Sequence, residues 1–505
     1  MSPWCPREST WSFQLVCVCL ALILAGPATT VLAGDSSPAG TVFGWRENPL
    51  AKAEETRSPE PAAPSADAGK KHTEPSFAPE ILAWQTTNGA RVLFVQAMEL
   101  PMIDIKVVFD GGAARDGDKK GVAALTNGLL IEGAGDWDAK QLADRFDSVG
   151  ARYGNSSHHD MTIVSLRSLV DPKLLETALS TFATVLSQPT FPADAFERDR
   201  RNTLLTLQQE QESPGDIANR QFDKAVFGAH PYASQAIGNI ESVKSLTLDD
   251  VKAHYRRYYV ARNAVIAMVG AVDETQARNI AERLTAGLDA GEAAPDLPPV
   301  KDLEEAVEIR TPHPSAQTHI LVGQPGIRRG DPDYFPLYVG NHILGGNGLV
   351  SRLAETIREQ RGLSYSTYSY FSPMRRRGPF IMGLQTRNDQ AGEALNLLRK
   401  ELRRFIDQGP SEKELDDAVK NITGGFPLRL ASNKKIADHL AVIGFYRLPL
   451  DYLATFNRKV RAVTVAQIKD AFQRRIHPDK MVTVIVGGTT AAQQTRRRHS
   501  LDASS

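Results

Sequence analysis

Cysteine is almost absent from this chain of 505 residues. Its three cysteines, Cys5, Cys17 and Cys19, all lie within residues 1–33. If that segment is removed, as its layout predicts, the remaining chain contains no thiol. This composition excludes disulfide bonds and a cysteine nucleophile, so the exported protein must be stabilised by burial of its core.

Residues 1–33 have the layout of a secretory signal. Arg7 is their only basic residue, residues 15–26 form an apolar run that is short for a membrane span, and residues 31–33 fit a cleavage site. We therefore expect an exported, periplasmic protein with no stable membrane span after cleavage. The alternative is an uncleaved N-terminal anchor that leaves the protein facing the periplasm.

The chain also lacks a surplus of charge of either sign, with 59 basic and 59 acidic side chains. Proteins that bind nucleic acid normally carry a basic surplus, so this class of partner is excluded. No Gly-x-Ser-x-Gly motif of a serine hydrolase occurs. The Gly-Gly-Asn-Gly run at residues 345–348 lacks the Lys-Ser/Thr of a phosphate-binding loop, so a nucleotide site is not indicated either.

What the chain does contain is an internal repeat. Residues 242–270 align with residues 459–487 at a constant offset of 217, which pairs Thr247 with Thr464. Each copy predicts a threonine that caps an amphipathic helix, followed by a β-rich run that ends in glycine. The repeat predicts two homologous domains of roughly 200 residues in which strands and helices are intermixed, which is the α+β class.

Composition sets the expected boundaries of these domains. Residues 34–78 are rich in Pro, Ala, Ser and charge, which predicts a flexible leader. The domains are predicted at residues 79–286 and 303–490, with a Pro-rich, acidic linker at residues 287–302. Residues 491–505 are expected to form a disordered tail.

The first domain opens with clear local patterns. An Asn-Gly pair at Asn88 predicts a hairpin turn, alternation over residues 101–109 predicts a strand, and residues 122–131 predict an apolar helix. A long strand is predicted over residues 152–166.

The predicted strand at residues 152–166 carries His158, His159 and Asp160, the densest group of metal-ligand side chains. Successive side chains of a strand point to opposite faces, so the two histidines are poorly placed to share a metal. We expect a polar strand edge here. A metal site, held by His158 and Asp160, is the less favoured alternative because two ligands make a weak site.

The second domain is organised around residues 343–371. This stretch opens with a turn made of Gly345, Gly346, Asn347 and Gly348. Leu349, Leu353 and Ile357 then recur every four residues, which predicts an amphipathic helix that packs by the face they share.

Gly362 is expected to end this helix, and alternation from Ser364 predicts a strand. Arg358 then lies in the last helical turn and Tyr365 at the start of the strand. A tight turn between them aims a guanidinium and a phenol at one point, where two strong donors can bind a carbonyl oxygen or stabilise an oxyanion. From the residues alone, a surface arginine beside a packed tyrosine remains the alternative.

This stretch resembles the C-terminal domain of the pitrilysin/insulinase-type (M16) metallopeptidases. The resemblance rests on a Gly-Gly turn, an S-R-L run, R-E-x-R-G-L-x-Y and a Ser/Tyr-rich strand, matched here by Gly345, Gly346, Ser351, Arg352, Leu353, Arg358, Glu359, Arg361, Gly362, Leu363 and Tyr365. It implies a clam-like pair of domains over residues 79–490. It also implies that Arg358 and Tyr365 reach a substrate held at a zinc site in another domain.

Active members of the family carry H-x-x-E-H on the first helix of the N-terminal domain, with a third, acidic ligand further on. The resemblance places the two ligands and the general base on Ala124, Asn127 and Gly128, none of which can do that chemistry. The helix expected to supply the third ligand, residues 200–209, contains no Asp or Glu. We therefore expect no metal and no other cofactor in this chain.

The resemblance implies a zinc-less subunit of the bacterial, mitochondrial-processing-peptidase-like type. Such a subunit works in a heterodimer whose H-x-x-E-H partner holds zinc and whose substrate is an unfolded peptide. Arg358 and Tyr365 would stabilise the oxyanion, and the Gly345–Gly348 turn takes the place of the family's substrate-handling loop. The alternatives are a simple tight turn and, for the whole chain, a non-enzymatic structural or peptide-binding protein like the core subunits of respiratory complexes.

Overall fold

The computed structural model describes residues 78–488. The predictions for the signal segment, for nearly all of the leader and for the tail fall outside this range. Within it the chain has the expected α+β composition, with one mixed sheet in the first half and another in the second half. None of the helices in this range is long and apolar enough to cross a membrane.

The first sheet has the strand order β1-β2-β8-β3-β7-β6. Its strands are β1 (Leu82–Gln85), β2 (Arg91–Gln96), β3 (Met102–Phe109), β6 (Arg152–Ser157), β7 (Thr162–Leu169) and β8 (Ala264–Gly270). Only β2 and β8 run parallel. Strand β8 is buried along its whole length, which explains its continuous apolar sequence. A small pair, β4 (Gly133–Ala134) and β5 (Trp137–Asp138), lies apart.

The second sheet has the order β11-β12-β10-β13-β9, again with one parallel pair, β13 and β9. Its strands are β9 (Val307–Thr311), β10 (Gln317–Pro325), β11 (Ser364–Phe371), β12 (Pro379–Arg387) and β13 (Val482–Val486). Strands β6 and β11 therefore each form one edge of their sheet.

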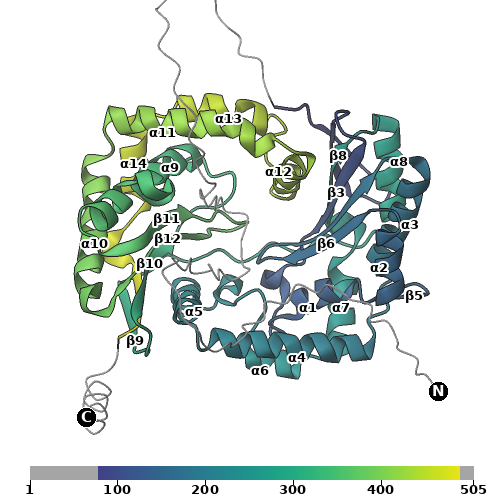
Figure 1. Cartoon of the computed structure of the whole chain (residues 1–505), viewed down its shortest axis with the longest axis horizontal. Helices are drawn as coiled ribbons and strands as arrows, with labels where there is room; N and C mark the ends of the chain where they lie inside the picture. Colours follow the sequence, from purple (N-terminus) through teal and green to yellow (C-terminus); the bar gives the residue numbers. More distant parts are fainter. Residues whose placement is uncertain (1–77, 489–505) are drawn as a thin grey trace, which may run out of the picture. The chain divides into compact units, whose positions relative to one another are not determined.

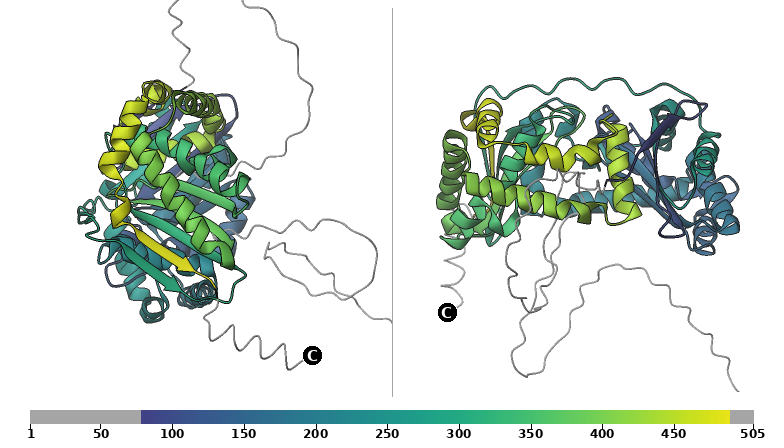
Figure 2. Two further views of the ribbon diagram at one scale, coloured as in Figure 1. Left: turned by 90° about the vertical axis from the view of Figure 1, so that its left-hand side faces the viewer. Right: turned by 90° about the horizontal axis from the view of Figure 1, so that it is seen from above.

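Some of the α-helices pack on the two sheets, and others pack mainly on other helices (Figure 1). Those of the first half are α1 (Val122–Leu129), α2 (Ala139–Asp147), α3 (Pro172–Ser187), α4 (Ala193–Glu210), α5 (Pro214–Phe227), α6 (Ile240–Ser245), α7 (Leu248–Tyr258) and α8 (Glu274–Thr285). Those of the second half are α9 (Tyr334–Asn341), α10 (Ala391–Gln408), α11 (Glu412–Gly425), α12 (Asn433–Phe445), α13 (Tyr452–Arg461) and α14 (Val465–Arg475). Helices α10 and α14 pack together in the second half (Figure 2, left).

The structure confirms the internal repeat. Helices α7 and α14 begin directly after Thr247 and Thr464, and each threonine side chain accepts the backbone N–H three residues on, as part of a capping box. Each helix leads into a fully buried strand, β8 or β13. The hairpin at Asn88, the strand at residues 101–109 and the helix at residues 122–131 are confirmed as well.

The two halves exchange one helix each. Helix α5 packs on β10 and β13 of the second sheet, and α12 packs on β3 and β8 of the first sheet (Figure 1). The contacts are close: a Cβ on Gly323 would lie 2.8 Å from the Phe222 ring, and a Cβ on Gly444 would lie 2.4 Å from Val265 Cγ1. Each sheet therefore completes its core with a helix from the other half.

The segment predicted as a linker has no regular secondary structure but is firmly anchored. Leu297 and Val300 are buried. The Arg376 Nε–H donates to the Leu297 carbonyl at 2.6 Å, and Arg377 Nη2 donates to the Val300 carbonyl at 2.7 Å. The basic hairpin tip between β11 and β12 thus holds the connection between the two halves in place.

Candidate functional site

The prediction of one helix starting at Leu349 is wrong. The chain forms a π-helix, η4 (His342–Gly346), a 3₁₀ turn, η5 (Gly348–Val350), and a second π-helix, η6 (Ala354–Glu359). Leu353 and Ile357 are buried as expected, whereas Leu349 is 52% exposed. The predicted amphipathic packing, with Leu353 and Ile357 buried, therefore holds only for the residues after Ser351.

The glycine pair explains the interruption. A Cβ on Gly345 would lie 2.5 Å from Ser369 Oγ, and a Cβ on Gly346 would lie 2.8 Å from Asn341 Nδ2. Because Gly345 lacks a side chain, its backbone can approach strand β11 this closely, and because Gly346 lacks one, the chain can fold back on Asn341 at the end of α9. The contact diverts the chain outward at Asn347, and the helix restarts one turn later.

Gly362 ends η6, as predicted. Its φ is +61°, its N–H donates to the Arg358 carbonyl at 2.8 Å, and the Leu363 N–H donates to the Ile357 carbonyl at 3.0 Å. A residue with a left-handed backbone followed by a buried apolar residue is a common helix stop. The stop turns the chain directly into β11.

Tyr365 lies in a β-bulge of β11. Ser364 pairs with Thr386 and Thr367 with Leu384, so Tyr365 and Ser366 together oppose a single residue of β12. A bulge redirects the side chain that it carries, and bulges and π-helices both occur often beside functional sites. The side chain of Tyr365 is accordingly 77% exposed.

The structure brings Arg358 and Tyr365 together, as the sequence predicts. The Arg358 guanidinium carbon lies 4.7 Å from the centre of the Tyr365 ring. Arg358 Nε also pairs with Glu359 Oε1 at 3.3 Å, and no other carboxylate of the described chain forms an ion pair with Arg358. A guanidinium and a phenol, both strong donors, thus lie side by side.

The positions on α1 that the resemblance assigns to zinc ligands carry no side chain able to bind a metal. Ala124 and Gly128 lie one turn apart and are half-buried. Asn127, at the position of the base, is buried and engaged: its Nδ2 donates to the Ser156 carbonyl at 2.9 Å, and its Oδ1 accepts from the Tyr259 hydroxyl at 3.2 Å. The side chain therefore ties α1 to the neighbouring strand and helix, and these three residues do not fit a zinc ion.

Acidic residues near the expected third ligand are committed elsewhere. Glu210, at the end of α4, pairs with Arg220 at 2.9 Å, and Glu132 pairs with Arg198 at 2.6 Å. Within residues 78–488, no group of three or more His, Asp, Glu or Cys side chains is placed to hold a metal. The side chains at these positions do not fit the family's zinc site.

The prediction of one strand through His158, His159 and Asp160 is also wrong. Strand β6 ends at Ser157 and β7 begins at Thr162, so the three residues form the hairpin turn. The reason is the burial of Asp160, which is only 3% exposed and binds groups from both halves. An internal carboxylate with hydrogen-bonded partners replaces the expected polar strand edge.

Asp116, a buried carboxylate beside α1, is not among the residues predicted from the sequence. Its two oxygens accept the backbone N–H groups of Gly121 and Ala123 at 2.7 and 3.0 Å, which caps the helix. Burial raises the pKa of Asp116 to about 7 despite these bonds. An Asp a few residues before an apolar helix was the available signal.

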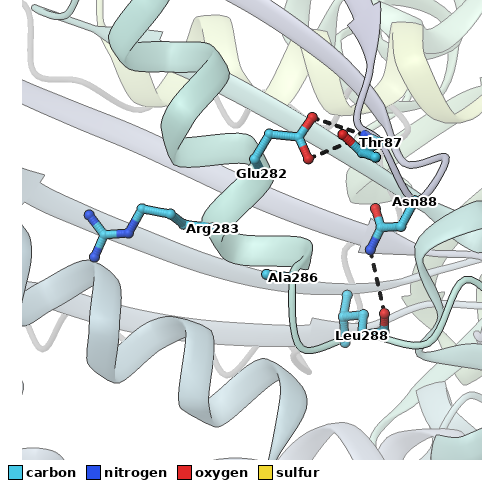
Figure 3. A pocket seen from close by; sticks show the side chains of 6 residues that line it. All are labelled: Thr87, Asn88, Glu282, Arg283, Ala286 and Leu288. Carbon is cyan, nitrogen blue, oxygen red and sulfur yellow. Dashed lines mark hydrogen bonds between the residues drawn. The ribbon is translucent and has the colours of Figure 1, made fainter.

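A surface depression lies far from this chemistry, at the β1–β2 turn and the end of α8 (Figure 3). Glu282 accepts the Thr87 N–H at 2.9 Å, and Asn88 Nδ2 donates to the Thr285 carbonyl at 2.6 Å. These contacts fix the hairpin to the helix. They account for the polar residues there without a ligand.

Comparison with known proteins gives two family matches. Residues 91–239 match the family described as insulinase (peptidase family M16), and residues 245–422 match the one described as peptidase M16 inactive domain. A crystal structure of a peptidase M16 inactive domain from Pseudomonas fluorescens is 40% identical, covers 81% of this chain and 98% of that chain, and has a TM-score of 0.79.

Two relatives carry contrasting names. The non-peptidase homolog YmxG of Helicobacter pylori is 26% identical over 80% of this chain and 94% of its own length. An uncharacterized zinc protease of Streptomyces coelicolor is 27% identical over 62% of this chain and 69% of its own length. Similarity in sequence therefore extends both to proteins named as peptidases and to one named as lacking that activity.

Proposed function

Because this chain belongs to the M16 peptidase family, we propose that it is a zinc-less subunit that completes the site of a partner peptidase. The observation that carries the proposal is an asymmetry within the chain. Arg358 and Tyr365 are held together on irregular backbone, whereas Ala124, Asn127 and Gly128 cannot hold a metal. The chain thus carries the arginine and tyrosine of the family's site but lacks its zinc ligands and general base.

In this proposal Arg358 and Tyr365 bind the backbone carbonyl of an unfolded peptide. As the carbonyl becomes tetrahedral, its oxygen gains charge and the two donors stabilise it. Nε of Arg358 pairs with Glu359 Oε1 at 3.3 Å, and in this proposal the other guanidinium nitrogens bind the carbonyl oxygen. The partner chain, bearing H-x-x-E-H, would supply the zinc-activated water.

The edge strands offer a place for the peptide backbone. An extended peptide can add to the edge of a sheet through main-chain hydrogen bonds. Strand β11, which carries Tyr365, is an edge strand, and the Gly345–Gly348 turn lies against it. We propose that the turn handles the substrate beside this strand and that the heterodimer acts in the periplasm.

Capture of the tagged full-length chain from its own source, followed by mass spectrometry, tests the partnership. We expect a near-stoichiometric M16 chain bearing H-x-x-E-H. In the reconstituted pair, Arg358→Ala should lower kcat for a model peptide by about a hundredfold, the effect of removing one oxyanion donor. Pair assembly, followed by size-exclusion chromatography, should not change.

The second candidate is a non-enzymatic structural or peptide-binding protein, favoured by the similarity to a relative named as a non-peptidase homolog. The capture experiment distinguishes it from the first candidate. If this chain is captured alone or with an unrelated envelope protein, Arg358 and Tyr365 are inherited features of the fold and the subunit proposal is wrong.

A further inference from the structure

Three exposed apolar side chains belong to one end of the first sheet, in the β2–β3 connection and at the end of β7. Met98 is 63% exposed, Leu100 is 54% exposed and Leu169 is 38% exposed. Leu169 pairs with Met102 across β7 and β3, and the Met102 N–H donates to the Leu100 carbonyl at 2.7 Å. We call Met98, Leu100 and Leu169 the apolar corner. Apolar residues exposed singly are ordinary, whereas three at one corner indicate a surface with an occupant.

The leader joins the first domain at this same end of the sheet. Strand β1 runs antiparallel to β2 with Leu82 opposite Phe94, so the start of β1 lies beside the end of β2. The β2–β3 connection, which carries Met98 and Leu100, begins at that end. The chain that precedes β1 therefore arrives next to the apolar corner.

One short run of the leader is apolar and aromatic. Val42, Phe43 and Trp45 lie within four residues, and Arg46 follows them directly. Phe43 and Trp45 are the only Phe, Trp or Tyr residues between positions 34 and 76. The remainder of that segment is rich in Pro, Ala, Ser and charge, so this run is the part of the leader suited to an apolar surface.

Charge favours this run over a lipid surface as the occupant of the corner. Glu99 lies between Met98 and Leu100, is exposed, and forms no ion pair or hydrogen bond with any residue from 78 to 488. The anionic headgroups of a bilayer attract Lys and Arg and repel a carboxylate. The Arg46 guanidinium, next to Trp45, supplies the opposite charge that Glu99 lacks.

We propose that the apolar corner binds residues 42–46 of the same chain, with Phe43 and Trp45 on the apolar side chains and Arg46 beside Glu99. The intervening residues, 47–77, act as the tether. A chain of that length spans about 30 Å on average, which gives the run an effective concentration of about a millimolar. Docking leaves only residues 34–41 of the leader ahead of the contact.

The size of the corner suits a tethered segment better than a second folded protein. A stable interface buries about 800 Å² on each partner, which three side chains cannot supply. An aromatic side chain buries about 150–250 Å², so two of them match the corner. Because the segment is tethered, even a weak contact is largely occupied.

Disulfide trapping tests the contact, because no cysteine follows residue 33. The protein is the full-length chain with its three cysteines changed to alanine, and it carries Gly44→Cys and Pro101→Cys. Both positions adjoin the proposed contact and leave its apolar side chains in place. The matched control combines Gly44→Cys with Gln208→Cys, at an exposed position of α4, a helix that packs on α1 and α6. We expect the first pair to form an internal disulfide at least tenfold faster than the control pair, measured by peptide mass spectrometry after mild oxidation.

Serine variants show whether the apolar side chains are responsible. Phe43→Ser with Trp45→Ser should remove the tenfold advantage, and so should Met98→Ser with Leu100→Ser. Thermal melting confirms that each variant is folded, and the leader variants keep the test valid if the corner variants fail to fold.

Three outcomes would overturn the proposal. Equal rates for the two cysteine pairs would show that the leader does not occupy the corner. An unchanged rate in the folded serine variants would show that the apolar side chains do not hold it. A disulfide-linked dimer in place of the internal disulfide would assign the corner to a second copy of the chain.

Discussion

The carboxylate of Asp160, in the first half of the chain, accepts a hydrogen bond of 2.9 Å from the hydroxyl of Tyr446, in the second half. Two further donors complete the site, the Tyr232 hydroxyl at 2.5 Å and the Arg375 N–H at 2.7 Å. Burial, with the Asp160 charge beside it, raises the pKa of Tyr446 well above its ordinary value, so the phenol stays protonated and donates. One buried carboxylate thus connects the β6–β7 turn to α12 and to the β11–β12 hairpin.

Loss of this carboxylate should destabilise the whole protein. Asp160→Ala leaves three buried donors without an acceptor, and we expect it to lower the free energy of unfolding by about 3 kcal/mol. Tyr446→Phe removes one bond and should cost about 1.5 kcal/mol. Urea unfolding followed by circular dichroism measures both. Tyr365→Phe, at an exposed ring, is the control, and an equal effect of all three variants would argue against the Asp160 network.

The exchanged helices predict that the halves depend on one another. A fragment of residues 79–286 lacks α12, so the apolar face of β3 and β8 is open to water. We expect this fragment to aggregate or to bind a hydrophobic dye. Coexpression with residues 287–490 should restore a soluble pair. A stable, monomeric first half with no dye binding would contradict this account of the core.

Glu359 should position Arg358. Neighbours i and i+1 do not face each other on an ordinary α-helix, yet here the two side chains meet at the end of a π-helix. Glu359→Gln should leave stability within about 0.5 kcal/mol, as expected for an exposed ion pair. It should lower kcat of the heterodimer severalfold, with a smaller change in KM. Glu355→Gln, one turn earlier, is the control, and equal kinetics for both variants would show that Glu359 has no such role.

His254 should make stability depend on pH. It is buried on α7, its Nε2–H donates to the Gly111 carbonyl at 3.0 Å, and burial lowers its pKa to about 4. The unfolded chain, with an ordinary histidine pKa near 6.5, therefore takes up a proton first as the pH falls. The contribution of His254 to the free energy of unfolding is about 3 kcal/mol. It is constant above about pH 6.5 and is lost as the pH falls from about 6.5 to 4.

Urea unfolding at a series of pH values tests this expectation. His254→Gln should reduce the loss of stability between pH 6.5 and 4, because the unfolded variant no longer takes up that proton. His158, His342 and His439, whose pKa values burial also lowers to about 4, keep their share of the loss. His477→Gln, at an exposed position, should keep the wild-type slope. Identical slopes for all three proteins would refute the assignment to His254.

Restoring the motif alone should not restore zinc binding. The triple variant Ala124→His, Asn127→Glu, Gly128→His still lacks the third carboxylate, because residues 200–209 contain none. It also loses the bonds of Asn127 to Ser156 and Tyr259, so we expect about 2 kcal/mol less stability. Metal analysis after dialysis should find far less than one zinc per chain. Stoichiometric, tightly held zinc would show that another residue completes the site.

Several features of the fold and of the candidate site can be predicted from local sequence patterns. Thr247 and Thr464 are identified by their position before amphipathic runs, and the structure confirms both caps. Gly362 is identified as a helix stop because glycine tolerates a positive φ. Spacing also predicts that Arg358 and Tyr365 converge, since a short turn joins a helix end to a strand.

The predictions that failed depend on contacts between distant residues. The sequence of residues 152–166 is predicted as one strand and gives no sign of a turn at His158, because the turn buries Asp160 against Tyr446, 286 residues later in the chain. The apolar period at Leu349 predicts burial, but Gly345 packs on β11 and Gly346 on Asn341, the helix is interrupted, and Leu349 is 52% exposed.

The sequence by itself determined the repeat, the capped helices and the helix stop at Gly362, each of which depends on residue identity and short-range spacing. The assignment of Ala124, Asn127 and Gly128 to a lost zinc site depends on the resemblance to the M16 family, and the structure adds that Arg358 and Tyr365 lie together. Only the tertiary structure decided the exchange of α5 and α12, the burial of Asp160 and the exposure of Leu349 and Val350. The physical reason is that a helix or turn packs its apolar residues against the surface that is nearest in space, and the local sequence does not specify which surface that is.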